Sequence, residues 1–223
     1  MTKISDAGSI RTAPRLRYSE HINRRTTQSI FRAFDFAEAK GCPLDTYVVI
    51  VLADGNADED FRAIRHKFRD WLTYLSRRDG ATARPHYVFT FENPDGHTHV
   101  NWVLHVPDRY KKEFAAKLAK WVVKVRGRIE APDIDVQAVT AHPKSLAKYI
   151  AKGTDPAFVK HFFLERVHAP QGWFRGIRAA ASTSLDKAAR TASAFRPQRG
   201  ARPWRTPLNG QQPLTIYSYL RPS

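Results

Sequence analysis

The sequence predicts an α+β domain built on one β-sheet, with its helices packed on a single face. Apolar runs and residues that alternate between apolar and polar mark the strands. Two amphipathic helices stand between them, with apolar residues at every third or fourth position. The order strand, helix, strand, strand, helix, strand brings both helices to one side of the sheet, so we expect the opposite face to be open.

The chain before the first strand is polar and basic. Residues 1–26 have the composition of an arm with little fixed structure, and residues 27–40 suggest a short helix that is closed by glycine and proline. We therefore treat residues 1–43 as a basic arm with a short helix. The valine-rich run 47–52 is unbroken, which is typical of a buried central strand.

The remaining elements follow in a regular order. Apolar stripes predict helices over residues 58–78 and 108–127, and the stretch 87–107 between them reads as a β-hairpin. Residues 134–140 supply a fourth strand. This order is that of ferredoxin-like or RRM-like βαββαβ domains, and we assign it to residues 44–160.

The hairpin carries a polar face. In Asn93-Pro-Asp-Gly96, proline at the second position and glycine at the fourth suit a four-residue turn, which pairs Glu92 with His97 and Thr90 with His99. Alternation then gathers histidine, amide and carboxylate groups on one face and aromatic rings on the other. Two interpretations stand: a polar face exposed to solvent, or a site for magnesium or manganese, which prefer such ligands in the absence of cysteine. The candidate metal ligands are His99, Asn101, Glu92 and His97.

A further helix is predicted from Pro143 to Lys152, since proline suits the first turn and Gly153 ends the helix. Tyr149 and Lys152 are three residues apart and share one face. Taken alone, this pair has an ordinary structural interpretation, in which the tyrosine ring packs and the lysine is solvated.

The C-terminal region, residues 161–223, differs in composition from the preceding domain. Residues 160–223 hold 11 Lys and Arg against 2 Asp and Glu, and glycine, proline, serine and alanine dominate. We expect a basic and largely irregular tail, partly disordered, with a helix at 184–193. Its function would be to clamp a nucleic-acid backbone and stack on bases. A tail that only aids solubility is the alternative.

The composition narrows the class of partner. A formal charge of +16 with a pI of about 10.3 indicates that the partner is a polyanion. The 12% of aromatic residues favours single-stranded nucleic acid as that partner. The single Cys42 excludes a disulfide framework and cysteine-based zinc sites. Since no run of about 18 apolar residues exists, we expect no membrane-spanning segment and a cytoplasmic location. No predicted helix separates basic from apolar faces strongly enough to favour a membrane surface as partner.

Two motifs resemble those of the HUH endonuclease superfamily, the replication initiators of rolling-circle plasmids and phages with related relaxases and transposases. Members carry His-hydrophobic-His on a strand, and His99-Val-Asn101 is similar. They also carry Tyr-x-x-Lys on a later helix, matched by Tyr149-Ile-Ala-Lys152. The resemblance covers roughly residues 44–190.

The first motif departs from the family pattern. When the motif is aligned by the following His105-Val-Pro107, Asn101 stands where the family has its second histidine. An amide oxygen can still ligate magnesium, although more weakly. The alternative register uses His97 and His99, with threonine at the usually hydrophobic middle position.

The resemblance implies site-specific nicking and joining of single-stranded DNA by a single-tyrosine initiator of plasmid or phage replication. Tyr149 would attack a phosphodiester to give a 5′-phosphotyrosine and a free 3′-hydroxyl, with Lys152 supplying positive charge. Mg²⁺ or Mn²⁺ on His99, Asn101 or His97, and Glu92 would polarise the phosphate.

The implied partners are single-stranded DNA at an origin or hairpin and a host helicase. The side chains expected to contact DNA are Arg175, Arg178, Lys148, Trp173 and Arg190. The competing class is a catalytically decayed or non-enzymatic nucleic-acid-binding sheet domain, which Asn101 favours.

Overall fold

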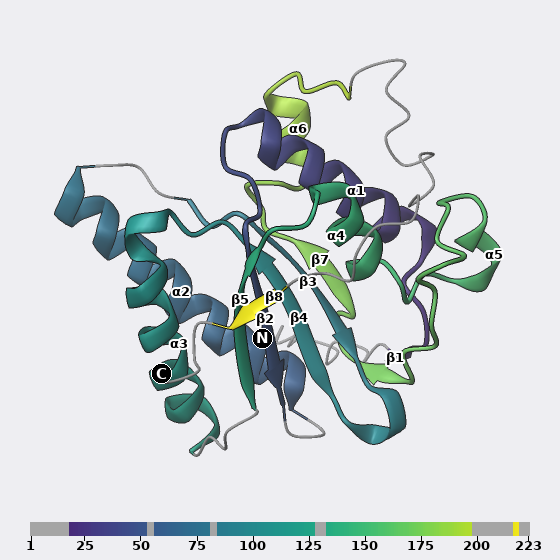
Figure 1. Ribbon diagram of the computed structural model, residues 1–223, viewed down its shortest axis with the longest axis horizontal. Coiled ribbons are helices and arrows are strands. Elements are labelled where there is room, and N and C mark those ends of the chain that lie inside the picture. The colour runs from purple at the N-terminus through teal and green to yellow at the C-terminus, as the bar shows by residue number, and fades with distance from the viewer. Residues whose placement is uncertain (1–17, 53–55, 81–83, 128–132, 198–215, 219–223) are drawn as a thin grey trace, which may run out of the picture.

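A computed structural model describes residues 18–52, 56–80, 84–127, 133–197 and 216–218 (Figure 1). Residues 1–17 of the predicted arm 1–26 and the tail segments 198–215 and 219–223 lie outside the described residues. The helices are α1 (Arg24–Ala39), α2 (Ala57–Asp79), α3 (Lys111–Arg126), α4 (Pro143–Ile150), α5 (Pro156–Val159) and α6 (Lys187–Ala192), with 3₁₀ turns at Pro94–Gly96 and Asp108–Tyr110. The strands are β1 (Tyr18–Ser19), β2 (Thr46–Val51), β3 (Tyr87–Glu92), β4 (His99–Leu104), β5 (Ile134–Val139), β6 (Phe174–Arg175), β7 (Ala179–Ala181) and β8 (Ile216–Ser218).

The molecule is an α+β protein with an antiparallel sheet of order β7-β3-β4-β2-β5-β8. Its middle strands come from the predicted run of strand, helix, strand, strand, helix, strand. β7 extends the sheet beyond β3, and β8 extends it beyond β5. β1 and β6 form a separate two-stranded ribbon.

One face of the sheet is covered by α2 and α3, as the two apolar stripes predict (Figure 1). Phe61 and Phe68 of α2 and Phe114 of α3 pack edge-on around Trp102 of β4, and all four side chains are buried. Aromatic pairs of this kind add to the free energy of burying apolar area. This layer is the larger of the two hydrophobic cores.

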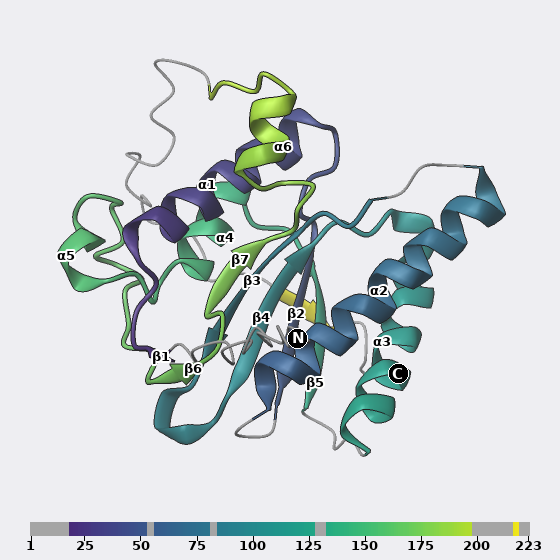
Figure 2. The ribbon, with the colours of Figure 1, turned by 180° about the vertical axis from the view of Figure 1, so that it is seen from behind.

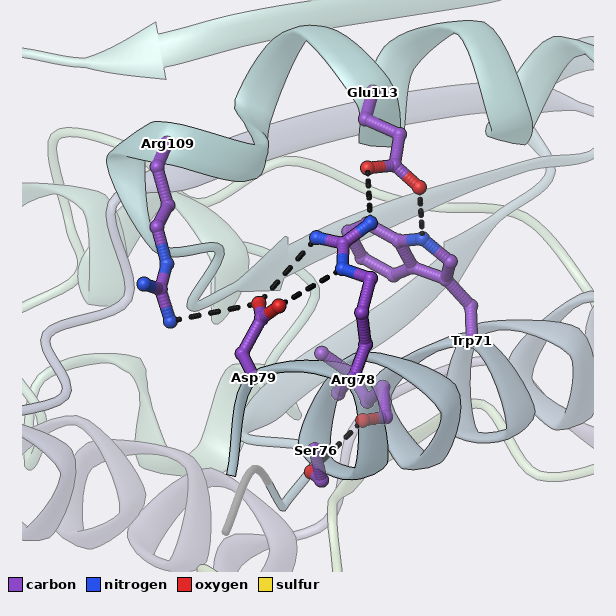
Figure 3. A network of polar contacts seen from close by, with 7 residues as sticks. Trp71, Ser76, Arg78, Asp79, Arg109 and Glu113 are labelled. Atoms are coloured by element: carbon purple, nitrogen blue, oxygen red, sulfur yellow. Dashed lines mark hydrogen bonds and ion pairs between the residues drawn. The ribbon is translucent and has the colours of Figure 1, made fainter. Parts of the chain in front are cut away.

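Polar contacts fasten the end of α2 to α3 (Figure 3). The Trp71 indole N–H donates to Glu113 at 2.8 Å, and the Arg78 guanidinium bridges Glu113 and Asp79. Arg109 reaches the same Asp79 carboxylate at 3.7 Å. The network lies on the side of the sheet away from α4, so it supports the scaffold and takes no part in the site described below.

The opposite face of the sheet is not open, which corrects the expectation of helices on one face only. α1 and α4 lie over it (Figure 2). Ile30 and Phe34 of α1 join Val88 and Val103 of the sheet in a second buried cluster. The physical reason is that this face also carries apolar side chains, and α1 has an apolar stripe that needs a partner.

The hairpin between β3 and β4 is paired two residues away from the predicted register. Glu92 lies opposite His99 and not His97, and the later pairs move by the same amount. The loop takes six residues, 93–98, because Pro94–Gly96 forms a 3₁₀ turn. A shift of two residues keeps each side chain on its predicted face.

Residues 161–197 fold back onto the domain, where the sequence suggested a largely irregular tail. β7 adds to the β3 edge, and Phe195, just after α6, packs on Phe36 of α1 with ring centroids 4.9 Å apart. Leu164 and Leu185 are fully buried. The segment at 161–197 and α1 therefore contribute to the same core as the sheet.

In the described part of the chain, no helix combines the length and the apolar character that crossing a membrane requires.

Candidate active site

Six polar side chains meet where the sheet faces α4, and we call this cluster the polar site. Five were singled out from the sequence, and the sixth is a tyrosine of β2. They are Tyr47, Glu92, His99, Asn101, Tyr149 and Lys152.

Glu92 is the centre of the polar site. Its side chain is about 5% exposed, and its Oε2 lies 3.1 Å from His99 Nε2 and 3.0 Å from Lys152 Nζ. His99 reaches it because the two residues are paired across β3 and β4. A carboxylate this deeply buried requires such partners, since an unpaired buried charge is costly.

Helix α4 carries the tyrosine to the sheet. Leu146 and Ile150 hold the helix in the second core, which leaves Tyr149 at its edge, half-buried. The Tyr149 ring meets Tyr47 edge-on at 6.2 Å, and Lys152 Nζ sits 4.1 Å from the Tyr149 ring centroid. Lys152 lies just past the end of α4, in the turn that follows. The predicted Tyr-x-x-Lys pair thus faces the predicted hairpin ligands.

Tyr47 fixes the amide of Asn101. Its hydroxyl donates to Asn101 Oδ1, and both side chains are buried. Burial raises the pKa of Tyr47 far above its ordinary value, and the neighbouring Tyr149 and Glu92 raise it further. Tyr47 therefore stays a neutral hydrogen-bond donor beside the Tyr149 hydroxyl.

Lys152 is a permanent cation in the polar site. Burial by itself lowers its pKa, but attraction to Glu92 and the hydrogen bonds to Glu92 and Tyr149 outweigh this, so the pKa is raised. The ammonium group is therefore in contact with both the buried carboxylate and the phenol.

The donor set suits a divalent cation in part. His99 Nε2 and Glu92 Oε2 lie 3.1 Å apart in a hydrogen bond, and both are atom types that a divalent cation accepts as ligands. Asn101 Oδ1 accepts one hydrogen bond and has a second lone pair for a metal. Among the described residues, Asn101 Nδ2 and the hydroxyl of its cross-strand neighbour Thr90 are buried without a hydrogen-bond partner. These two buried polar groups therefore have unused hydrogen-bonding capacity beside the candidate ligands.

His97 does not reach the polar site. Its side chain is exposed, and only its backbone carbonyl contacts the His99 ring, at 3.2 Å from Nδ1. The register with Asn101 is therefore the one that the geometry favours. No group of three or more His, Cys, Asp or Glu side chains converges in the described ranges, so any cation here depends on the amide as its third protein ligand.

The five expected DNA-contacting side chains divide into two groups. Trp173 and Arg175 are exposed. Arg178, Arg190 and Lys148 are buried, which corrects their expected position at the surface. Burial lowers the pKa of Arg178 to about 10, and its guanidinium donates to the backbone carbonyls of Ser19, Phe91 and Gly172.

The other two buried cations, Arg190 and Lys148, also lie in the protein interior. Arg190 donates to Leu185 O and lies near Ser29 Oγ, and burial lowers its pKa. Burial likewise lowers the pKa of Lys148, whose side chain is 2% exposed in α4. Arg190 therefore supports the chain around α6, and neither side chain is exposed for contact with DNA.

The sequence did not single out Tyr47 as a site residue. It lies in an apolar run, where a tyrosine is indistinguishable from a packed ring. Only the pairing of β2 with β4 shows that its hydroxyl reaches Asn101. The signal available beforehand was alternation along β2, which puts Tyr47 on the face opposite Val48.

Comparison of the chain with models of protein families, with curated proteins and with solved structures gave no match.

Proposed function

We propose that this protein nicks and rejoins single-stranded DNA through a covalent bond to Tyr149, as an initiator of plasmid or phage replication would. The observation that carries the proposal is the meeting of the Tyr149 and Lys152 pair with Glu92 and His99, from segments far apart in sequence. The buried ion pair explains why Lys152 meets Glu92, and the proposal adds a reason why Tyr149 and the candidate metal ligands gather at the same place.

The strand order supports the same assignment. β3-β4-β2-β5, joined by α2 and α3, is the arrangement expected of a ferredoxin-like βαββαβ domain, and we assign the fold to that class. The resemblance of the two motifs to the HUH superfamily then places the nucleophile on the helix after the last strand of the unit. α4 occupies that place.

The chemical step is a transesterification. The Tyr149 hydroxyl oxygen bonds to the phosphorus, the bond from phosphorus to the 3′ oxygen breaks, the phenolic proton passes to water, and the 3′ oxygen takes up a proton. The products are a 5′-phosphotyrosine and a free 3′-hydroxyl, and the reverse reaction rejoins the strand without ATP.

The residues around Tyr149 fit distinct parts in this step. The Lys152 ammonium contacts the phenol and would stabilise negative charge as it develops on the phosphate or the phenolate. Tyr47 stays protonated and orients the neighbouring hydroxyl and amide. A Mg²⁺ or Mn²⁺ ion held by His99, Glu92 and Asn101 would polarise the scissile phosphate.

A covalent-capture assay tests the proposal. Purified protein, Mn²⁺ and a random-sequence pool of single-stranded DNA are incubated, and denaturing gels detect DNA bound to protein. A label on the 3′ end should stay with the protein, while a label on the 5′ end should leave with the free 3′-hydroxyl fragment. The partner expected in replication, a host helicase, is not needed for this readout.

Tyr149→Phe should abolish the adduct and leave salt-sensitive DNA binding intact. Tyr74→Phe is the matched control, because Tyr74 is an exposed tyrosine on α2, across the sheet from α4. His99→Ala should lower nicking far more than DNA affinity. An adduct of unchanged yield in Tyr149→Phe would reject the assignment.

One observation favours a second candidate, a non-enzymatic binder of single-stranded nucleic acid. Lys152 already neutralises Glu92, as in a site that has lost its cation and closed on itself. The same assay separates the two functions, since a binder retains DNA at low salt but forms no adduct that survives denaturation.

A further inference from the structure

Exposed aromatic and apolar side chains lie on the ribbon of β1 and β6 and on residues just before and after β6. Six large hydrophobic side chains are exposed in the part of the chain that the structure describes, and three of them lie here: Tyr18 at 64%, Trp173 at 62% and Ile177 at 51%. Arg175 is exposed beside them, opposite Tyr18 in the ribbon pairing. We call these four residues the ribbon surface.

The exposure of the ribbon surface follows from how the ribbon packs. Phe174 points inward and stacks on Phe91, with ring centroids 4.3 Å apart and planes 13° from parallel. Because side chains alternate along a strand, Trp173 and Arg175 on either side of Phe174 must point outward. Burying one aromatic ring thus presents another to solvent.

The ribbon is held rigidly to the sheet. The buried Arg178 guanidinium donates to Ser19 O, Gly172 O and Phe91 O, which joins both ribbon strands to β3. Gly172 has a φ of +66°, and a Cβ there would lie 2.0 Å from Asn93 O. Only glycine allows this close approach of the ribbon to the hairpin loop.

Two hydrogen bonds join the ribbon segments to residues that flank the polar site. On one side, Asn93, the residue after Glu92, donates from its side-chain amide to Trp173 O at 2.8 Å. On the other side, Ile22 N, three residues past β1, donates to Gly153 O at 2.8 Å, and Gly153 follows Lys152. The ribbon segments are therefore hydrogen-bonded to Asn93 and Gly153, the residues that directly follow the two partners of the central ion pair.

We propose that the ribbon surface binds the bases of the DNA strand beside the scissile phosphate. Trp173 and Tyr18 offer faces on which bases can stack, and Arg175 offers a phosphate contact. The exposed Arg24 and Arg25 at the start of α1, close after β1, continue the positive charge, in keeping with the net +16 of the chain. The position of the scissile bond rests on the proposed function, whereas base binding by the ribbon does not.

Fluorescence anisotropy with labelled single-stranded DNA tests this surface. The measurement uses the Tyr149→Phe protein, so that cleavage cannot contribute. Trp173→Ala should weaken binding about tenfold, in the range known for loss of one base stack, whereas Trp173→Phe should keep most of the affinity. Tyr74→Ala is the matched control, because Tyr74 is an equally exposed aromatic residue on α2, and its loss should change nothing.

The salt dependence separates stacking from charge. Trp173→Ala should leave the slope of log affinity against log salt unchanged, while Arg175→Ala should reduce it by about one. If Trp173→Ala binds DNA as tightly as Tyr74→Ala, the inference is overturned, and a changed oligomeric state at unchanged DNA affinity would instead make the ribbon a protein contact. Base-dependent binding without any covalent adduct in the wild type would refute the nickase and leave the ribbon proposal standing.

Discussion

Replacing Lys152 by methionine removes one partner of the most buried ion pair in the polar site. At 3.0 Å and an effective dielectric constant of about 20, the direct attraction is about 5 kcal/mol, which desolvation of both groups largely offsets. Removing one partner of a buried pair typically costs about 3–5 kcal/mol. Here His99 still donates to Glu92 and the Lys152 side chain is 15% exposed, so we expect a loss of about 2 kcal/mol.

Urea unfolding at neutral pH, followed by circular dichroism, measures this loss. Adding Glu92→Gln to Lys152→Met should restore about half of it, because the double variant no longer buries an uncompensated carboxylate. Tyr149→Phe keeps the ion pair and serves as the control, with a change below about 1 kcal/mol.

The reasoning fails if Lys152→Met unfolds at the wild-type urea concentration with an unchanged slope. It also fails if Glu92→Gln makes the Lys152→Met protein less stable still. Either result would mean that Glu92 is stabilised chiefly by groups other than Lys152, and the lysine would then be free for a different role.

Two further predictions concern groups outside the polar site. Burial, with help from nearby cations, lowers the pKa of His86 to about 4 from 6.5. Its stabilising contribution is therefore complete above pH 6.5 and is lost as the pH falls toward 4, by about 2 kcal/mol at pH 5. His86→Asn should remove this part of the difference between unfolding free energies at pH 7 and pH 5, and an unaltered difference would contradict the assignment. Arg178→Met should cost about 2–4 kcal/mol in urea unfolding, because several buried carbonyls lose their donor; a loss below about 0.5 kcal/mol would show that the ribbon has other anchors.

The sequence predicted correctly those parts of the fold in which apolar residues recur with a strong helical or strand periodicity. The apolar stripes of α2 and α3 predict which of their side chains are buried. The alternation in β3 and β4 puts Glu92, His99 and Asn101 on one face of the sheet. That assignment survived an error in the turn, because a slip of two residues preserves the face.

The parts that sequence reasoning missed depend on distant contacts. The six-residue hairpin loop is held by Asn93, which donates hydrogen bonds to the backbone carbonyls of Gln171 and Trp173, about 80 residues later. The cover on the second face comes from α1, whose stripe gives no indication of which surface it meets. β6 and β7 are too short for any period to show, and the burial of Arg178 follows only from the carbonyls gathered around it.

The return of β7 to the sheet sets a limit on dissecting this protein. All six residues of the polar site lie before position 153, so a fragment ending near residue 160 contains every one of them. Such a truncation would remove β7, the outer neighbour of β3 in the sheet. The edge of β3 would then expose unpaired backbone donors and acceptors, which can act as a template for aggregation. A minimal fragment that keeps the polar site should therefore extend past Phe195, and proteolytic cuts between α5 and β7 should unfold the part of the sheet that holds the polar site along with the piece they release.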